Sequence, residues 1–344
     1  MPDVLDPSLA TCYLMNHTVS GQIVMYFVQL SYALPISLLY LFVIFKILRK
    51  HMVEQMFSDA YFRIYVLDGV VSIIVLVLDF GLTRPLIYVN PMCQVFRETF
   101  PEPTYLLTPY LFLFNYFQFA KIFSITLLSA NRFTCVAYPV WHKLFWRKRT
   151  NHVIFLSLLA PVVFTWHLAI SPTRVDVYYG ESLLGYEKVV PFIKTTFNKL
   201  VVSIVAFLFM LLTNIKTYQL TKAFINKRKS LEHSLTLSTI IISGVFVIYI
   251  IIQAILLVFS TSFLVENLTF GSLLKKFEFI CNDFYLMSSP IVLLIMNRRL
   301  REMVFQVAPE APRNSSNTKN SNEMGNTFMK SPSAKTLNSA VVKF

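Results

Sequence analysis

Charged residues, glycines and cysteines are all scarce in this chain of 344 residues. Charged residues make up 14% and hydrophobic residues 55% of it, with a mean hydropathy of +0.58. A water-soluble domain of this length has too little interior to bury that much apolar surface, so a soluble globular protein is excluded. The 8 glycines form no phosphate-binding loop, and the 4 cysteines include no C-x-x-C pair. With only 6 scattered histidines, we expect no metal site, no cofactor and no enzyme activity.

Seven long apolar runs fill most of the chain. A helix of about 20 apolar residues crosses the hydrocarbon core of a bilayer, and these runs are too long for barrel strands and lack a period of two. The predicted fold class is therefore an all-α membrane protein with a seven-transmembrane helix bundle in residues 23–296. Because the first run is too long for a signal peptide, we interpret it as the first span. The spans are expected near 23–48, 62–82, 107–131, 152–171, 195–215, 235–260 and 275–296.

Basic residues collect on alternate sides of these runs, which predicts an extracellular N-terminus and a cytoplasmic C-terminus. The net charge of +13 is then a topology signal rather than a sign of nucleic-acid binding. Residues 1–22 are expected to form a short extracellular arm and residues 297–305 a short amphipathic helix. Residues 306–344 are rich in Ser, Asn, Thr and Lys, which predicts a disordered cytoplasmic tail.

Two cysteines and two glycosylation sequons fall on the predicted outer side. Cys12 and Cys93 either form a disulfide between the arm and the first outer loop or remain two free thiols. Asn16 and Asn267 each begin an Asn-x-Thr sequon and are candidates for glycosylation.

Charged residues inside the spans are costly, so they are expected to be paired or functional. Lys121 lies at a depth comparable with Asp68 and Asp283 when counted from the inner helix ends. We therefore predict an intramembrane charge network in which Lys121 pairs with Asp68 or with Asp283. Such a pair either acts as a two-state element that helps to set an inactive state or is a static bridge, and in a third interpretation Asp283 contacts a ligand.

The third span carries a dense stretch of polar and aromatic residues. Asn115 and Gln118 are three positions apart and share one helix face. An outer cavity lined in this way suits a small, largely apolar ligand with a few polar groups. These two residues, with Asp283, are the candidate ligand pocket.

The inner end of the third span reads Asn131-Arg132-Phe133, with Pro139 following. This segment resembles the Asp-Arg-Tyr element of rhodopsin-like G-protein-coupled receptors, and the resemblance implies that Asn131, Arg132 and Pro139 take part in G-protein coupling. Asn131 replaces the acidic neighbour of the arginine, and the loop after the fourth span lacks the cysteine typical of that family.

A narrower resemblance is to nematode serpentine chemoreceptors of class gamma, with the related classes u and v as alternatives. It rests on the order of four segments, which are 32–40, 61–69, Ser129–Phe133 with Pro139 and Trp146, and 289–294. The resemblance implies a multi-pass plasma-membrane receptor of sensory cilia that binds an external small molecule and activates a heterotrimeric G protein.

The alternative function is a ligand-gated channel or transporter subunit, in which Asp68, Asp79 and Asp283 would line a path. The odd number of spans and the lack of an inverted repeat argue against it.

Overall fold

A computed structural model of the chain describes residues 19–51, 60–178, 181–190, 194–223, 230–259 and 268–305. These belong to one compact unit, Met1–Val307. Its elements, in chain order, are α1 (Val19–His51), α2 (Ala60–Leu78), the π-helical turn η3 (Asp79–Thr83), α3 (Arg84–Tyr88), α4 (Asn90–Thr99), α5 (Thr108–Ala137), α6 (Pro139–Ala169), β1 (Thr173–Tyr178), β2 (Glu181–Tyr186), α7 (Thr195–Ala223), α8 (Ser230–Phe259), α10 (Leu268–Met296) and α11 (Arg298–Phe305).

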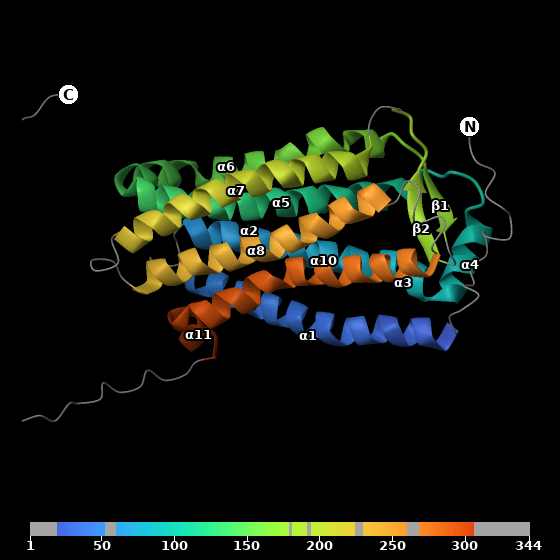
Figure 1. The fold of residues 1–344 in the computed structure, drawn as a ribbon, viewed down its shortest axis with the longest axis horizontal. Coiled ribbons are helices and arrows are strands. Elements are labelled where there is room, and N and C mark those ends of the chain that lie inside the picture. Colours follow the sequence, from blue (N-terminus) through green and yellow to red (C-terminus); the bar gives the residue numbers. More distant parts are fainter. Residues whose placement is uncertain are drawn as a thin grey trace, which may run out of the picture. The chain divides into compact units, whose positions relative to one another are not determined.

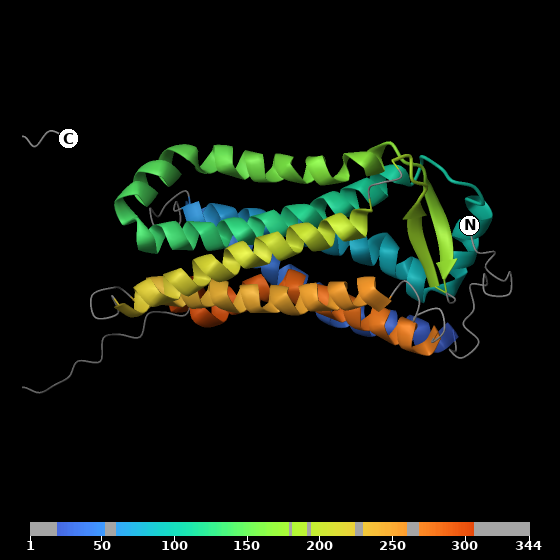
Figure 2. The same ribbon diagram turned by 45° about the horizontal axis from the view of Figure 1, so that its top comes forward.

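Seven of the described helical segments are long and apolar enough to cross a membrane, which confirms the predicted fold class. They run roughly side by side, with the β1–β2 hairpin and α4 at one end and α11 at the other (Figures 1 and 2). We call these the hairpin end and the α11 end. The candidate spans are Ser20–Arg49, Ala60–Tyr88, Thr108–Ala137, Pro139–Ala169, Thr195–Leu220, Leu235–Val258 and Lys276–Met296.

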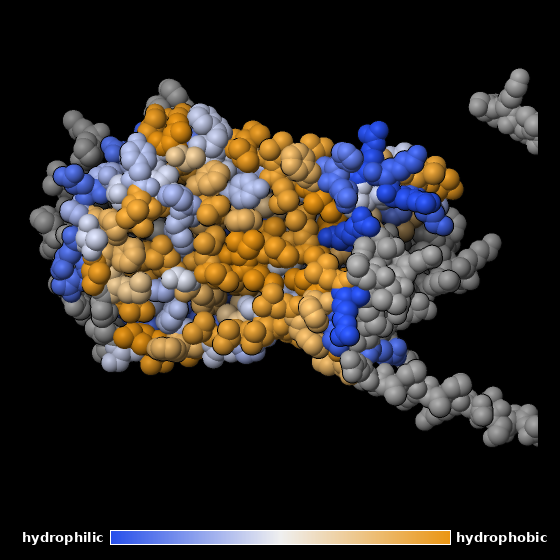
Figure 3. All heavy atoms as spheres, turned by 180° about the vertical axis from the view of Figure 1, so that it is seen from behind, coloured by the Kyte–Doolittle hydropathy of each residue, from blue (hydrophilic) through white to orange (hydrophobic). Residues whose placement is uncertain are grey.

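On the face shown in Figure 3, the surface of the bundle is apolar around its middle, and hydrophilic residues gather toward its ends. Large apolar side chains such as Phe27, Phe155 and Ile295 are exposed on the spanning helices. In water such a surface would be unfavourable, whereas acyl chains solvate it without penalty. The buried interior, in contrast, also holds charged side chains, among them Asp68, Asp79, Arg84, Lys121 and Asp283.

Three features of the fold differ from the sequence prediction. The fourth spanning helix begins at Pro139 rather than near residue 152. Proline is well suited to the first turn of a helix, because the N–H that it lacks would have no partner within the helix there. The second spanning helix continues past residue 82 to Tyr88. The segment after α6 forms an antiparallel hairpin in which Thr173 pairs with Tyr186, although no strand was predicted there.

Candidate functional site

The second spanning helix contains a π-helical turn, Asp79–Thr83, at which the N–H of Arg84 bonds to the carbonyl of Asp79. Pro85 follows directly, and a proline ring clashes with the carbonyl of the residue four positions before it in a regular α-helix. The wider turn relieves that clash and lets the helix continue. Its extra residue also rotates the following side chains by about 100°, since one residue corresponds to that angle in an α-helix.

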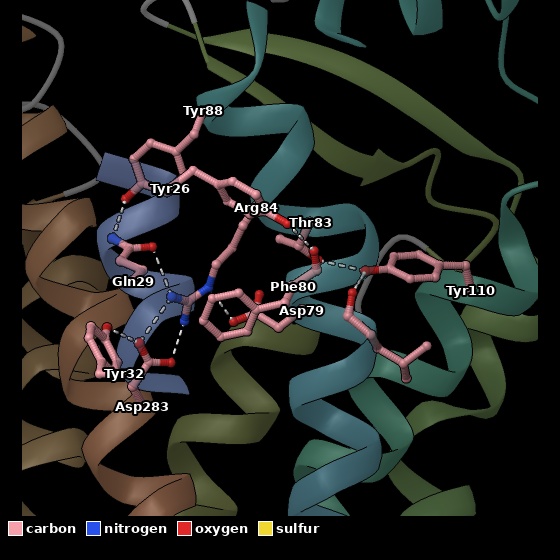
Figure 4. Close-up of polar contacts among 11 residues, drawn as sticks. Tyr26, Gln29, Tyr32, Asp79, Phe80, Thr83, Arg84, Tyr88, Tyr110 and Asp283 are labelled. Atoms are coloured by element: carbon pink, nitrogen blue, oxygen red, sulfur yellow. Dashed lines mark hydrogen bonds and ion pairs between the residues drawn. The ribbon is translucent and has the colours of Figure 1, made fainter. Parts of the chain in front are cut away.

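This rotation points Arg84 into the bundle, where its guanidinium is fully buried among acceptors (Figure 4). Its Nε donates to Asp79 at 2.9 Å, and Nη1 donates to Gln29 at 2.8 Å and to Asp283 at 3.0 Å. Nη2 makes a second, shorter bond to Asp283. The guanidinium carbon also lies 3.9 Å from the ring centroid of Phe80. We call Arg84, Asp79, Asp283 and Gln29 the arginine cluster.

Side chains from α1 and α3 complete the arginine cluster (Figure 4). Tyr32 donates to the carboxylate of Asp283 at 2.5 Å, and Gln29 donates to the hydroxyl of Tyr88 at 3.1 Å. Tyr26 donates to the carbonyl of Phe80 at 3.0 Å. The cluster therefore ties α1, the π turn, α3 and α10 together in the half of the bundle nearer the hairpin end.

A second buried ion pair lies deeper in the bundle. The ammonium of Lys121 donates to both carboxylate oxygens of Asp68 at 2.8 Å, and both side chains are fully buried. Asp68 also accepts hydrogen bonds from Ser124 at 2.6 Å, Ser289 at 3.0 Å and Tyr40 at 3.1 Å. We call Asp68, Lys121, Ser124, Ser289 and Tyr40 the aspartate cluster. It joins α1, α2, α5 and α10 through one carboxylate, and the five donor contacts to that carboxylate offset the large desolvation penalty of burying it.

These contacts decide between the two pairings of Lys121 that the sequence left open. Lys121 pairs with Asp68, whereas Asp283 belongs to the arginine cluster, six positions nearer the hairpin end of α10 than Ser289. The second cation, Arg84, is absent from the predicted network, because the second span was expected to end at residue 82 and in the structure continues to Tyr88. A signal was available, since Arg84 follows the apolar run without a break.

A third group of polar side chains lies between α5, α7, α8 and α10, which we call the four-helix polar group. Lys199 donates to the amide oxygen of Gln118 at 2.5 Å, and its ammonium lies 5.4 Å from the ring centroid of Tyr249. Gln253, one turn after Tyr249, donates to Glu278 at 2.6 Å. Gln118, Lys199, Gln253 and Glu278 are each partly exposed, in contrast to the fully buried ion pairs.

Two stacked tyrosines connect the four-helix polar group to the aspartate cluster. The rings of Tyr249 and Tyr285 lie 4.8 Å apart and within 11° of parallel. The ammonium of Lys121, in turn, lies 5.6 Å from the centroid of the Tyr285 ring. The buried hydroxyl of Tyr285 has no hydrogen-bond partner among the described residues. The two lysines thus flank one aromatic pair.

Near the α11 end, polar side chains hold α5 to the two helices beside it. Ser129 lies 2.8 Å from the hydroxyl of Thr213 and donates to Asn214 at 3.1 Å. Asn214 in turn donates to Ser243 at 2.8 Å. This chain crosses from α5 through α7 to α8, one turn before Arg132.

The other residues selected from the sequence have separate environments. Asn131 and Arg132 are buried at the α11 end of α5, and Pro139 begins α6. Asn115 donates to the carbonyl of Leu111 on its own helix at 2.9 Å, so it does not join Gln118 in the four-helix polar group. Across the described part of the chain, no three His, Cys, Asp or Glu side chains are placed to hold a metal ion.

Several predicted sites lie outside the described residues or side chains. These are Cys12, Asn16, Asn267, the side chain of Cys93 and residues 306–344. The proposed disulfide, the glycosylation of both sequons and the disordered tail therefore stay predictions.

Comparison with known proteins agrees with this architecture. A sequence model described as Srg family chemoreceptor matches residues 26–304. Among curated relatives from Caenorhabditis elegans, serpentine receptor class gamma-15 is 27% identical over 302 residues, which cover 87% of this chain and 91% of that receptor. Serpentine receptor class gamma-4 is 29% identical over 298 residues, covering 86% and 91% of the two chains. The chain therefore belongs to the Srg family of chemoreceptors.

Proposed function

We propose that this chemoreceptor binds an external small molecule among α5, α7, α8 and α10 and activates a heterotrimeric G protein at its α11 end. The hairpin end then faces outside, and the α11 end faces the cytoplasm of a sensory cilium, as family resemblance implies. Short basic segments favour the cytoplasmic side. Among the side chains that the structure describes, exposed basic residues of the α11 end include Arg49, Lys143, Arg147, Lys148, Arg149, Lys216 and Arg301.

The observation that carries the ligand site is the partial exposure of the four-helix polar group. Amide side chains avoid lipid, so the partly exposed Gln118 and Gln253 within spanning helices favour a polar space inside the bundle. Lys199 and Glu278 reach these amides from near the span ends. The aromatic neighbours Tyr249 and Phe117 supply apolar surface, and a few polar groups beside them give orientation. This chemistry suits a small molecule with an apolar body and one or two hydrogen-bonding groups.

A ligand that replaces the Lys199–Gln118 contact would act on the bundle through the stacked tyrosines. Tyr249 belongs to α8 and Tyr285 to α10, so a shift of α8 changes the surroundings of Lys121 and the aspartate cluster. The ligand drives such a change only to the extent that it binds the two states with different affinity.

At the α11 end, outward movement of α7 and α8 requires the Ser129–Asn214–Ser243 chain to exchange its hydrogen bonds. Each such bond contributes on the order of 1 kcal/mol, so the closed arrangement is reversible rather than permanent. Arg132 lies one turn beyond this chain, in the position where a G protein would meet it.

The test is a G-protein reporter cell that expresses the receptor and is exposed to a small-molecule panel. Arg132→Ala is expected to abolish the response at equal surface expression. Lys199→Met and Gln118→Leu are expected to weaken ligand potency about 10-fold or more. Each removes a polar side chain to which the ligand would hydrogen-bond when it replaces the Lys199–Gln118 contact. Lys194→Met is the matched control, since Lys194 is exposed beside the start of α7.

Two outcomes would overturn the proposal. A response that survives unchanged in Arg132→Ala would remove the coupling residue. Potency that is equal in Lys199→Met, Gln118→Leu and Lys194→Met would place the ligand elsewhere.

A further inference from the structure

The guanidinium of Arg132 stacks on an aromatic ring from the neighbouring helix. Its central carbon lies 3.7 Å from the ring centroid of Tyr61, the second residue of α2. Arg132 is 3% exposed and Tyr61 is 0% exposed, so water is largely excluded from the contact. A cation over an aromatic face is most stabilising in such a desolvated site.

The hydrogen-bonding groups of this arginine are only partly used. Its Nε and Nη2 are buried and have no acceptor within the described part of the chain. The preceding residue, Asn131, also has a buried amide nitrogen without an acceptor there. An asparagine carries no charge, so the adjacent side chain supplies no ionic restraint on Arg132.

We propose that Tyr61 is the positioning residue that restrains Arg132 in the resting receptor, in place of an acidic side chain. The restraint rests on the proposed G-protein coupling of this receptor and describes how that same site is regulated. The ring face stabilises the cation but accepts no conventional hydrogen bond from the N–H groups of Nε and Nη2. Buried donors without acceptors are unfavourable. They offset part of the stabilisation from the ring, so the resting position of Arg132 is only weakly stabilised.

A partner that offers backbone carbonyl or carboxylate oxygens at the α11 end supplies the acceptors that Nε and Nη2 of Arg132 lack among the described residues. Arg132 then leaves the ring and donates to the partner, which makes partner binding and ring release compete for one side chain. The basal activity of the receptor is accordingly set by the strength of the stack between α2 and α5, and it rises when the ring is removed.

The experiment combines two readouts on purified receptor in lipid nanodiscs. The first is basal nucleotide exchange on added heterotrimeric G protein, measured per folded receptor. The second is modification of Arg132 by phenylglyoxal, followed by mass spectrometry, which needs no G protein. The variants are Tyr61→Leu, which removes the ring, and Tyr61→Phe, which keeps the ring face. Tyr65→Leu is the matched control, because Tyr65 is an equally buried ring one turn along α2.

Tyr61→Leu is expected to raise basal exchange on the order of tenfold and to raise Arg132 modification, a change equivalent to about 1.4 kcal/mol. Tyr61→Phe is expected to restore low basal exchange and low modification. Tyr65→Leu is expected to behave like the parent receptor in both measurements. The added variant Tyr61→Leu with Arg132→Ala should return basal exchange to background, since the released side chain is then absent.

The two readouts separate the possible failures. Unchanged modification in Tyr61→Leu would overturn the restraint itself. Raised modification with unchanged exchange, in a receptor whose ligand response needs Arg132, would show that the stack does not regulate coupling. Equal rises in Tyr61→Leu and Tyr65→Leu would assign the effect to general loosening of α2. If no variant and no ligand produces exchange while Tyr61→Leu still raises modification, the proposed function fails and the stack stands only as a structural contact.

Discussion

Arg84 and Asp283 are 199 positions apart in the chain, and their side chains form a buried ion pair that joins α3 to α10. The same guanidinium also serves Asp79, so among the described residues one cation faces two carboxylates. The arginine cluster is therefore asymmetric, and the loss of its cation should matter more than the loss of either anion.

Replacing Arg84 by methionine should destabilise the receptor strongly. It leaves Asp79 and Asp283 buried without their cation, and breaking a buried pair in this way costs about 3–5 kcal/mol. Asp283→Asn should cost less, because Arg84 still pairs with Asp79. Thermal unfolding of purified receptor in detergent measures both. Equal destabilisation by the two variants would contradict the asymmetry.

The Lys121–Asp68 pair gives a second prediction. Asp68→Asn and Lys121→Met should each destabilise the receptor, since each leaves one buried charge unpaired. The double variant should be more stable than the sum of the two single effects predicts, with a coupling of about 0.5–3 kcal/mol. A double-mutant cycle of unfolding free energies tests this, and additive effects would count against a direct interaction. The exchanged pair, Lys121→Asp with Asp68→Lys, should recover surface expression relative to either single charge reversal.

Gly69 marks the close approach of α1 and α2. A Cβ added there would lie 2.6 Å from Cδ1 of Ile44 and 2.8 Å from Cε2 of Tyr40, whose hydroxyl is already committed to Asp68. Gly69→Ala is therefore expected to destabilise the receptor by about 1–3 kcal/mol. Gly244→Ala is the control, because a Cβ at Gly244 meets nothing within 4 Å. It should be neutral or stabilising by about 0.5–1 kcal/mol, since alanine favours helix. Unfolding midpoints that order the two variants the other way would refute the packing argument.

The tyrosine stack predicts different effects for two changes at one position. Tyr285→Phe should leave stability unchanged or slightly raised, because the hydroxyl it removes is buried without a partner among the described residues. Tyr285→Leu should lose the stacking with Tyr249, about 0.5–1.5 kcal/mol beyond the change in buried area. In the reporter cell, Tyr285→Leu should also reduce the maximal ligand response while Tyr285→Phe keeps it. A full response in Tyr285→Leu would remove the stack from the signalling route.

The hydropathy pattern along the chain was sufficient to predict the seven-helix architecture, but it did not predict where each helix begins and ends. The charge-poor run in α8 is long enough to span a bilayer whatever surrounds it, so its place is readable from composition. The start of α6 at Pro139 was not predictable in the same way, because the basic residues in the first turns of α6 resemble a loop in a hydropathy profile. The hairpin after α6 depends on cross-strand pairing, such as that between Thr173 and Tyr186, which a hydropathy profile does not record.

The candidate sites divide along the same line. Asp68 and Lys121 are apparent from sequence because charges inside apolar runs are rare. Lys199 and Glu278 lie nearer the span ends, where charged residues are common and do not indicate a site. Only the packing of α5, α7, α8 and α10 brings them near Gln118 and Gln253.

The amino-acid sequence by itself determined that this protein is a bundle of seven spanning helices, because the free energy of placing an apolar run in lipid is summed along the run and needs no knowledge of its neighbours. Only the tertiary structure decided which charge meets which. The partners of Arg84, Lys121 and Arg132 depend on the rotation of each helix about its axis and on one π-helical turn that resets that rotation. These rotation angles follow from side-chain packing between helices far apart in the chain, so they cannot be predicted from any single segment of the sequence.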